Sequence, residues 1–290
     1  MWFFYAIGFA IITSTYDVII AKKVMRQLDE YQFLWLSGLI TIVTQFILLV
    51  IFFEIPKINN TFIFSVIISS AINLIAGIAS YRAIRISEVS LIAPIAAFNP
   101  IFTTLISYFT LKEIIQINDL TGILMVCIGA YFLQISKQSK GLFEPLKSLF
   151  KNTGVKLALL AYLLWAITPT FQKVAINNTQ PAVPLFASFA GMIVTILFLS
   201  PFVLKFSKFS KLKLKNNLNL LIIGAILAAV GQMFAFTAFN LTSLGLATAV
   251  FKLDMLFTIF FGWLFFKEKN IKDKFVGALI MLVGTFLILM

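Results

Sequence analysis

The stretch SLIAPIAAFNPIFTTLISYFTLKEIIQINDLTGILMVCIGAYFL, residues 90–133, holds two apolar runs separated by a short polar gap that contains Lys112 and Glu113. The same layout returns 155 residues later as GLATAVFKLDMLFTIFFGWLFFKEKNIKDKFVGALIMLVGTFLIL, residues 245–289. In both copies a Lys-Glu pair closes the first run, and glycines follow nine and sixteen residues after the Glu. Because a membrane-spanning helix needs about 20 apolar residues, each copy predicts a pair of spans.

The rest of the chain has the same apolar character. Of its 290 residues 61% are hydrophobic and 12% are charged, whereas a soluble domain is about 45–50% apolar and about 25% charged. This composition excludes a water-soluble enzyme and predicts an all-α integral membrane protein. The apolar segments predict ten transmembrane helices at 2–21, 32–53, 62–82, 88–110, 119–136, 155–175, 182–204, 217–238, 245–266 and 271–289.

The repeat divides these ten helices into two groups of five. We expect a first five-helix unit at 1–136, a basic connecting loop at 137–154 and a second five-helix unit at 155–290. Since five is odd, the second unit enters the membrane from the opposite side. The sequence therefore predicts two inverted repeats, an arrangement found in many secondary transporters.

The formal net charge of +12 reflects the membrane topology of the chain and does not indicate a charged binding surface. Of the 23 Lys and Arg residues, 19 lie in the connections that follow the first, third, fifth, seventh and ninth helices. Cytoplasmic loops of membrane proteins are rich in these residues. We therefore expect a multi-pass protein of the plasma (inner) membrane with both termini on the extracytoplasmic side.

The two repeated stretches, together with YLLWAITPTFQKVA at 162–175, resemble the EamA-type transporters of the drug/metabolite transporter superfamily. The likeness covers nearly the whole chain. It departs at Met255, where the family pattern has a proline, and at Ala10, where it has a tryptophan. The resemblance implies transport of small organic solutes, commonly efflux of amino acids or related metabolites. The superfamily also includes nucleotide-sugar and sugar-phosphate exchangers, which the resemblance leaves open.

Two charged residues lie near the middle of the predicted ninth helix. Burying a charge at a helix centre costs roughly 2.5–3.5 kcal/mol, so Lys252 and Asp254 require partners or a wet cavity. They are two residues apart and point to different sides of an ideal helix. The functional interpretation is that Lys252 holds an anionic group of a substrate, while Asp254 binds an amine or exchanges a proton. The alternative is a structural ion pair with a neighbouring helix.

Polar and helix-breaking residues in other spans add further candidates. Asn99 occupies the repeat position of Asp254, beside Pro100 and close to Pro94, and these two prolines act either as hinges or as tolerated kinks. Asn73 and Gln232 either line a cavity or form interhelical hydrogen bonds. The remaining candidates are Asp17 at the mouth of a cavity or in the interface, Trp165 and Tyr81 facing a solute, and Pro169 as a hinge.

The repeated glycines and glutamates have a mainly structural interpretation. Gly122 and Gly129, like Gly277 and Gly284, are seven apart and therefore lie on one helix face, where small residues allow close packing. Glu113 and Glu268 lie at helix ends, where a carboxylate can cap a turn.

The chain has no His and a single Cys, so the common metal ligands and catalytic bases are missing and we expect neither an enzyme nor a bound cofactor. We expect a secondary active transporter that moves a small zwitterion or anion, such as an amino acid, by alternating access, with export as the direction. The alternatives are an exchanger of nucleotide-like or sugar-phosphate anions and a non-transporting membrane scaffold. The expected partners are a small molecule and the bilayer, with no nucleic acid; coupling to a proton or another ion, and the choice between monomer and homodimer, are left open.

Overall fold

The computed structural model describes residues 1–16, 24, 28–87, 89–134, 146–147, 151–207, 211–266 and 274–290. Within these ranges the chain is almost entirely helical, with one pair of two-residue strands. Eight segments of the described chain are long and apolar enough to cross a membrane, and two shorter apolar helices accompany them, namely α1 (Trp2–Thr15) and α14 (Phe275–Leu289). The expected all-α membrane protein is confirmed.

Most of the predicted spans correspond to one helix each, with ends that differ by a few residues. Besides α1 and α14 these helices are α3 (Glu30–Phe52), α4 (Asn60–Ile86), α7 (Ile117–Gln134), α9 (Thr153–Asn177), α10 (Pro184–Phe206) and α11 (Lys211–Leu241). The strands are β1 (Lys57–Ile58) and β2 (Thr179–Gln180), which pair antiparallel. The predicted first span runs to residue 21, and its last residues lie outside the described part of the chain.

The spans predicted at 88–110 and 245–266 each contain a segment long and apolar enough to cross a membrane, but each is divided into shorter helices. The first consists of α5 (Val89–Ile92), a 3₁₀ turn η2 (Ala93–Phe98) and α6 (Asn99–Leu111), and the second consists of α12 (Leu244–Phe251) and α13 (Asp254–Phe266). In the first span Pro94 and Pro100 each remove a backbone donor. In the second, the N–H groups of Lys252 and Leu253 bond to the carbonyls of Ala249 and Val250, three residues back, which tightens and ends α12.

The chain folds into two compact units, and each draws helices from both sequence halves. Unit 1 consists of Met1–Leu74 and Phe171–Leu241, and unit 2 consists of Ile75–Thr170 and Thr242–Met290. The division falls inside α4 and inside α9. The compact units therefore differ from the two sequence repeats.

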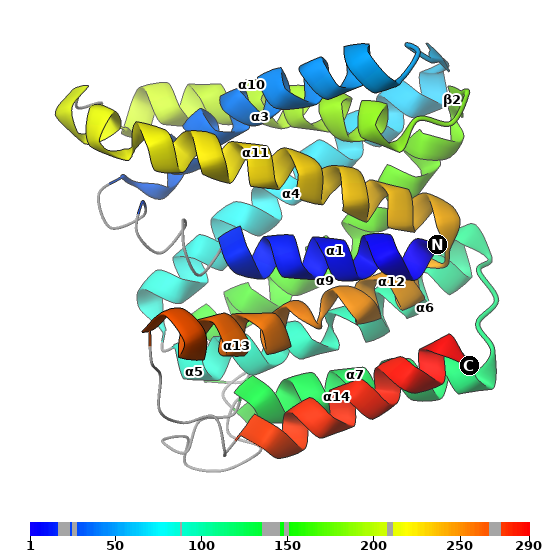
Figure 1. Ribbon diagram of the computed structural model, residues 1–290. Helices are drawn as coiled ribbons and strands as arrows, with labels where there is room; N and C mark the ends of the chain where they lie inside the picture. Colours follow the sequence, from blue (N-terminus) through cyan, green and yellow to red (C-terminus); the bar gives the residue numbers. More distant parts are fainter. Residues whose placement is uncertain are drawn as a thin grey trace. The chain divides into compact units, whose positions relative to one another are not determined.

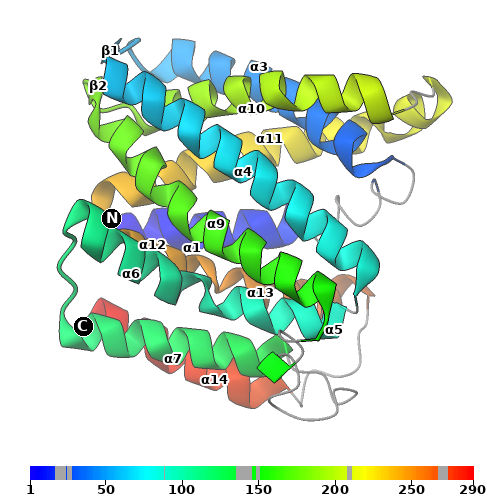
Figure 2. The same cartoon turned by 180° about the vertical axis from the view of Figure 1, so that it is seen from behind.

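Unit 1 is built on α3, which packs against α10 and α11, while α1 packs against α11. The helices α3 and α10 run antiparallel and side by side (Figure 2). Two hydrogen bonds tie them near opposite ends, from Trp35 Nε1 to Ser200 Oγ (2.9 Å) and from Gln45 Nε2 to Ser188 Oγ (2.8 Å). These polar contacts add to the apolar packing of Leu49 against Leu185 and of Trp35 against the cluster around Ile196.

Unit 2 contains the tightest helix pair, α7 against α14, which run antiparallel (Figure 1). Gly122 faces the backbone of Gly284, and Gly129 faces that of Gly277. A Cβ atom built at any of these four glycines would approach a backbone oxygen of the other helix to 2.6–2.8 Å. The predicted use of the glycines for close helix packing is confirmed, and it operates within one chain.

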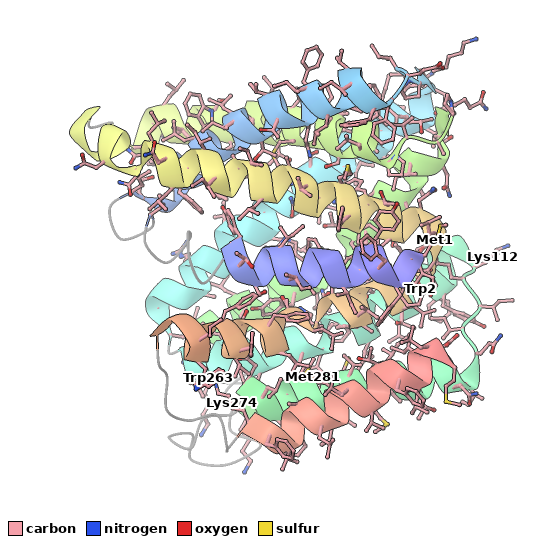
Figure 3. All side chains as sticks on the ribbon, viewed as in Figure 1. Met1, Trp2, Lys112, Trp263, Lys274 and Met281 are labelled. Atoms are coloured by element: carbon pink, nitrogen blue, oxygen red, sulfur yellow. The ribbon has the colours of Figure 1, made fainter. Side chains whose placement is uncertain are left out.

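The ends of unit 2 carry basic residues that are far apart. Lys112, at the turn after α6, and Lys274, at the start of α14, lie at opposite ends of the unit (Figure 3). Lys112 has a φ of 55°, a left-handed conformation that terminates α6.

Candidate functional site

The candidate site is the break between α12 and α13 in unit 2. Lys252 follows the C-terminus of α12, and Asp254 is the first residue of α13. A helix C-terminus carries a partial negative charge and a helix N-terminus a partial positive one, so each of these side chains lies at the helix end that stabilises its charge. The break thus explains how the membrane-spanning segment can hold both a cation and an anion.

The carboxylate of Asp254 has only part of its hydrogen-bonding capacity satisfied. The backbone N–H of Met255 meets its carboxylate in the first turn of α13, and the charge of Lys252 acts on it. Its Oδ1 atom is nevertheless buried and has no hydrogen-bond partner among the described residues. A buried acceptor without a donor is costly. One carboxylate oxygen of Asp254 therefore lacks a donor among the described residues.

The equivalent break in the first repeat lies against the same neighbour. The α6 helix begins at Asn99 and α13 begins at Asp254, positions that coincide under the shift of 155 residues. The buried Asn99 donates a hydrogen bond through Nδ2 to the backbone carbonyl of Tyr162 (2.9 Å), and the charge of Asp254 reaches the side chain of the same tyrosine. The break at Asn99 is thus hydrogen-bonded to α9 at Tyr162, a residue that also feels the charge of Asp254.

Aromatic and sulfur groups complete this neighbourhood. The ring of Trp165 lies 5.7 Å from that of Tyr162, one turn earlier on α9. Cys127 of α7 is buried, and the charge of Lys252 acts on it. The structure therefore brings together four predicted residues, Lys252, Asp254, Asn99 and Trp165. Sequence reasoning missed Tyr162, although its spacing of three from Trp165 places both on one helix face.

Two of the remaining predicted residues belong to unit 1. Gln232 Oε1 accepts hydrogen bonds from Gln45 Nε2 (3.0 Å) and Ser188 Oγ (2.9 Å), which matches the alternative interpretation as an interhelical contact. Gln45 and Ser188 are buried and were not predicted. Asn73 lies on α4 and is exposed. Gln232 therefore belongs to a hydrogen-bond network within unit 1.

The prolines lie where helices begin or where the compact units divide. Pro94 and Pro100 are buried in the first turns of η2 and α6. Pro169 is buried inside α9, and the division between the two units follows directly after Thr170. Asp17, Lys267 and Glu268 lie outside the described residues, as does the side chain of Tyr81.

Glu113 caps the N-terminus of α12, the first helix of the broken span in the second repeat. Its Oε2 accepts a hydrogen bond from the backbone N–H of Leu244 (2.8 Å), the first residue of α12. The predicted structural role is confirmed, but the carboxylate caps a helix distant in sequence rather than the following turn. This bond fixes the N-terminal end of the same short helix that Lys252 terminates.

Replacing Glu113 with alanine is expected to destabilise the protein by about 1–2 kcal/mol, because a charge-assisted cap of α12 is lost. Glu113→Gln keeps an acceptor for Leu244 and is expected to lose less than half of this amount. Thermal unfolding of the purified variants measures both effects, with Glu54→Ala as the control because Glu54 is exposed. Equal midpoints for Glu113→Ala and Glu54→Ala would contradict the assigned cap.

Comparison with known proteins agrees with this architecture. The model of the EamA-like transporter family matches residues 1–135 and 152–290. Among solved structures 29 chains match, and one crystal structure covers 99% of this chain and 98% of its own, with a TM-score of 0.76 and 12% sequence identity. At this identity the likeness shows the fold alone. Among curated proteins, no relative matches.

Proposed function

Because this chain belongs to the EamA-like transporter family, we propose that it is a secondary active transporter that exports a small zwitterion such as an amino acid across the plasma membrane. The observation that carries this proposal is the helix break between α12 and α13, which places the carboxylate of Asp254 and the ammonium group of Lys252 in the middle of one span. Transporters commonly bind their substrates at such discontinuous helices.

The proposal includes ten membrane crossings arranged as two inverted five-helix repeats. Two helix pairs support it, because each joins equivalent elements that run antiparallel. The α3 and α10 helices pair through Gln45 and Trp35, and α7 and α14 pair through their glycines. A two-fold relation between repeats is expected to produce contacts of this kind.

Contacts between the connections support the same number of crossings. Within unit 1, Asp29 before α3 accepts a hydrogen bond from Ser207 after α10 (2.9 Å), and β1 after α3 pairs with β2 after α9. Within unit 2, Ser87 after α4 donates to Asn152 before α9. Each contact joins connections that ten crossings would place on the same side of the membrane. From the excess of Lys and Arg in the connections after the odd-numbered helices, we propose that these connections face the cytoplasm.

The charges at the break favour a zwitterion over a polyanion. Lys252 provides a positive charge for a carboxylate group, and Asp254 provides a buried oxygen for an ammonium group. A sugar phosphate would bring its negative charge close to the Asp254 carboxylate, where like charges repel in a medium of low dielectric constant. This comparison makes the exchange of phosphorylated solutes the second candidate.

Alternating access requires a hinge at which the two compact units can change their relative orientation. We propose that Pro169 provides it, because this proline removes a backbone hydrogen bond inside α9 immediately before the division between the units. In this proposal the moving bodies are the compact units, each containing helices from both repeats, rather than the two sequence halves.

Proteoliposomes test the transport proposal directly. Vesicles containing the purified protein and loaded with the twenty common L-amino acids are expected to release at least one of them faster than protein-free vesicles. Ligand-induced thermal stabilisation by the same amino acids, but not by glucose 6-phosphate or uridine diphosphate glucose, is expected to accompany the flux. Stabilisation by the phosphorylated solutes alone would favour the second candidate, and a lack of any flux would favour a non-transporting protein.

A further inference from the structure

The hydroxyl group of Thr170 is buried and has no hydrogen-bond partner among the described residues. Other buried threonines inside helices donate to the carbonyl oxygen four residues earlier, at 2.7–3.0 Å, and these are Thr103, Thr104, Thr168, Thr248 and Thr285. A buried hydroxyl left unpaired raises the free energy of the folded state. The unpaired arrangement of Thr170 is therefore costly in the state described.

The acceptor that pairs the other threonines is also within reach of Thr170. Residues 166 and 170 belong to the same helix, α9, so the carbonyl of Ala166 lies one turn before Thr170. A threonine in a helix chooses between two χ1 rotamers, one of which directs Oγ1 to a carbonyl in the preceding turn. Rotation about a single side-chain bond could therefore pair this hydroxyl.

Such pairing would change the bend of α9. Pro169 has no N–H group to donate to the carbonyl of Trp165, which already weakens the helix at this turn. A threonine hydroxyl that bonds to the carbonyl four residues earlier competes with the backbone N–H and often bends the helix. The Thr170 hydroxyl would act on Ala166, the next carbonyl along the helix. Both effects fall directly before the division between the compact units.

The equivalent threonine in the first repeat has the paired arrangement. Thr15 coincides with Thr170 under the shift of 155 residues, and its Oγ1 donates to the carbonyl of Ile11 (2.8 Å). Ser14, which coincides with Pro169, donates to the same carbonyl (2.8 Å). In a transporter built from inverted repeats, the states open to opposite sides are related by an exchange of conformations between the repeats. Thr15 and Thr170 are therefore expected to exchange their arrangements.

We propose that the hydroxyl of Thr170 is a conformational switch, unpaired in the state described and bonded to the carbonyl of Ala166 in the opposite transport state, where α9 is more strongly bent. This inference rests on the proposed transport function and deepens the proposed hinge at Pro169. The unpaired hydroxyl raises the free energy of the described state, and its bond stabilises the bent helix of the opposite state. The hydroxyl therefore favours the change from the first state to the second.

Thr170→Val removes the hydroxyl and keeps the branched shape of the side chain. The unfolding midpoint of the purified protein is expected to rise by about 2–4 °C, because an unpaired buried polar group is lost. Amino-acid efflux from proteoliposomes is expected to slow about tenfold, because the bond of the opposite state is lost as well. Thermal stabilisation by the transported amino acid is expected to persist. Thr170→Ser keeps a hydroxyl and is expected to retain efflux.

Two matched variants separate the switch from a general effect of added apolar surface. Thr168→Val in the same helix and Thr15→Val in the first repeat each remove a paired hydroxyl, so neither is expected to raise the unfolding midpoint. Backbone hydrogen exchange, measured by mass spectrometry on peptides that span Pro169, reports the bend of α9 without depending on flux. The exchange is expected to slow in Thr170→Val and to accelerate in Thr15→Val.

The possible results separate this inference from the transport proposal. An equal rise of the midpoint in Thr168→Val, no rise in Thr170→Val, or unchanged efflux through Thr170→Val would overturn the switch. Loss of stabilisation by the amino acid in Thr170→Val would also overturn it, because the hydroxyl would then contact the substrate. If the wild type transports no amino acid while the midpoints and exchange rates change as expected, the switch stands and the transport proposal fails.

Discussion

Alanine at Gly129 is expected to lower the stability of the protein by about 3 kcal/mol, the upper part of the usual range for overpacking a core. A Cβ atom at this position would lie 2.6 Å from the carbonyl oxygen of Gly277 and 2.7 Å from the backbone nitrogen of Met281. Both are backbone atoms, so α7 and α14 must separate along their contact. Thermal unfolding in detergent, followed by the loss of monodisperse protein, measures the effect.

The matched control is the same substitution at Gly77 in α4. A Cβ atom at Gly77 would meet nothing within 4 Å, and alanine is favoured over glycine inside a helix by about 1 kcal/mol. Gly77→Ala is therefore expected to be neutral or slightly stabilising. Similar unfolding midpoints for the two variants would show that the close contact of α7 with α14 does not determine stability.

The second large effect is expected at Lys252. Removing its charge in Lys252→Gln is expected to cost about 2–4 kcal/mol of substrate binding, which corresponds to a roughly 30- to 1,000-fold loss of transport efficiency. The loss should be confined to substrates with a carboxylate group, because Lys252 is proposed to bind that end of the zwitterion. Amino-acid efflux from proteoliposomes and thermal stabilisation by the transported amino acid measure it.

Two comparisons make this prediction specific. Lys274→Gln removes an equal charge at the start of α14, at the end of unit 2, and is expected to transport normally (Figure 3). The decarboxylated analogue of the transported amino acid is expected to stabilise the wild type and Lys252→Gln equally, since it has no group for Lys252 to bind. Equal flux of amino acids through both lysine variants would remove Lys252 from the site.

The candidate site could be predicted only in part. The cost of a charge inside an apolar segment identifies Lys252 and Asp254 without any structure, and the repeat identifies Asn99. Tyr162 could not be found in this way, because a tyrosine in an apolar helix is ordinary and its role depends on contacts with two distant segments. For the same reason the network of Gln45, Ser188 and Gln232 was only partly anticipated.

The sequence by itself determined the membrane location, most helix bounds and the repeated pattern of lysine, glutamate and glycine, because these depend on composition and local spacing. The prolines already indicated a kink in the span around Asn99, whereas only the tertiary structure decided that the span around Asp254 is broken and that the compact units mix both halves of the chain. An apolar run looks the same whether its helix continues or ends. The difference lies in which backbone bonds form, and the energy that selects them comes from neighbours distant in sequence.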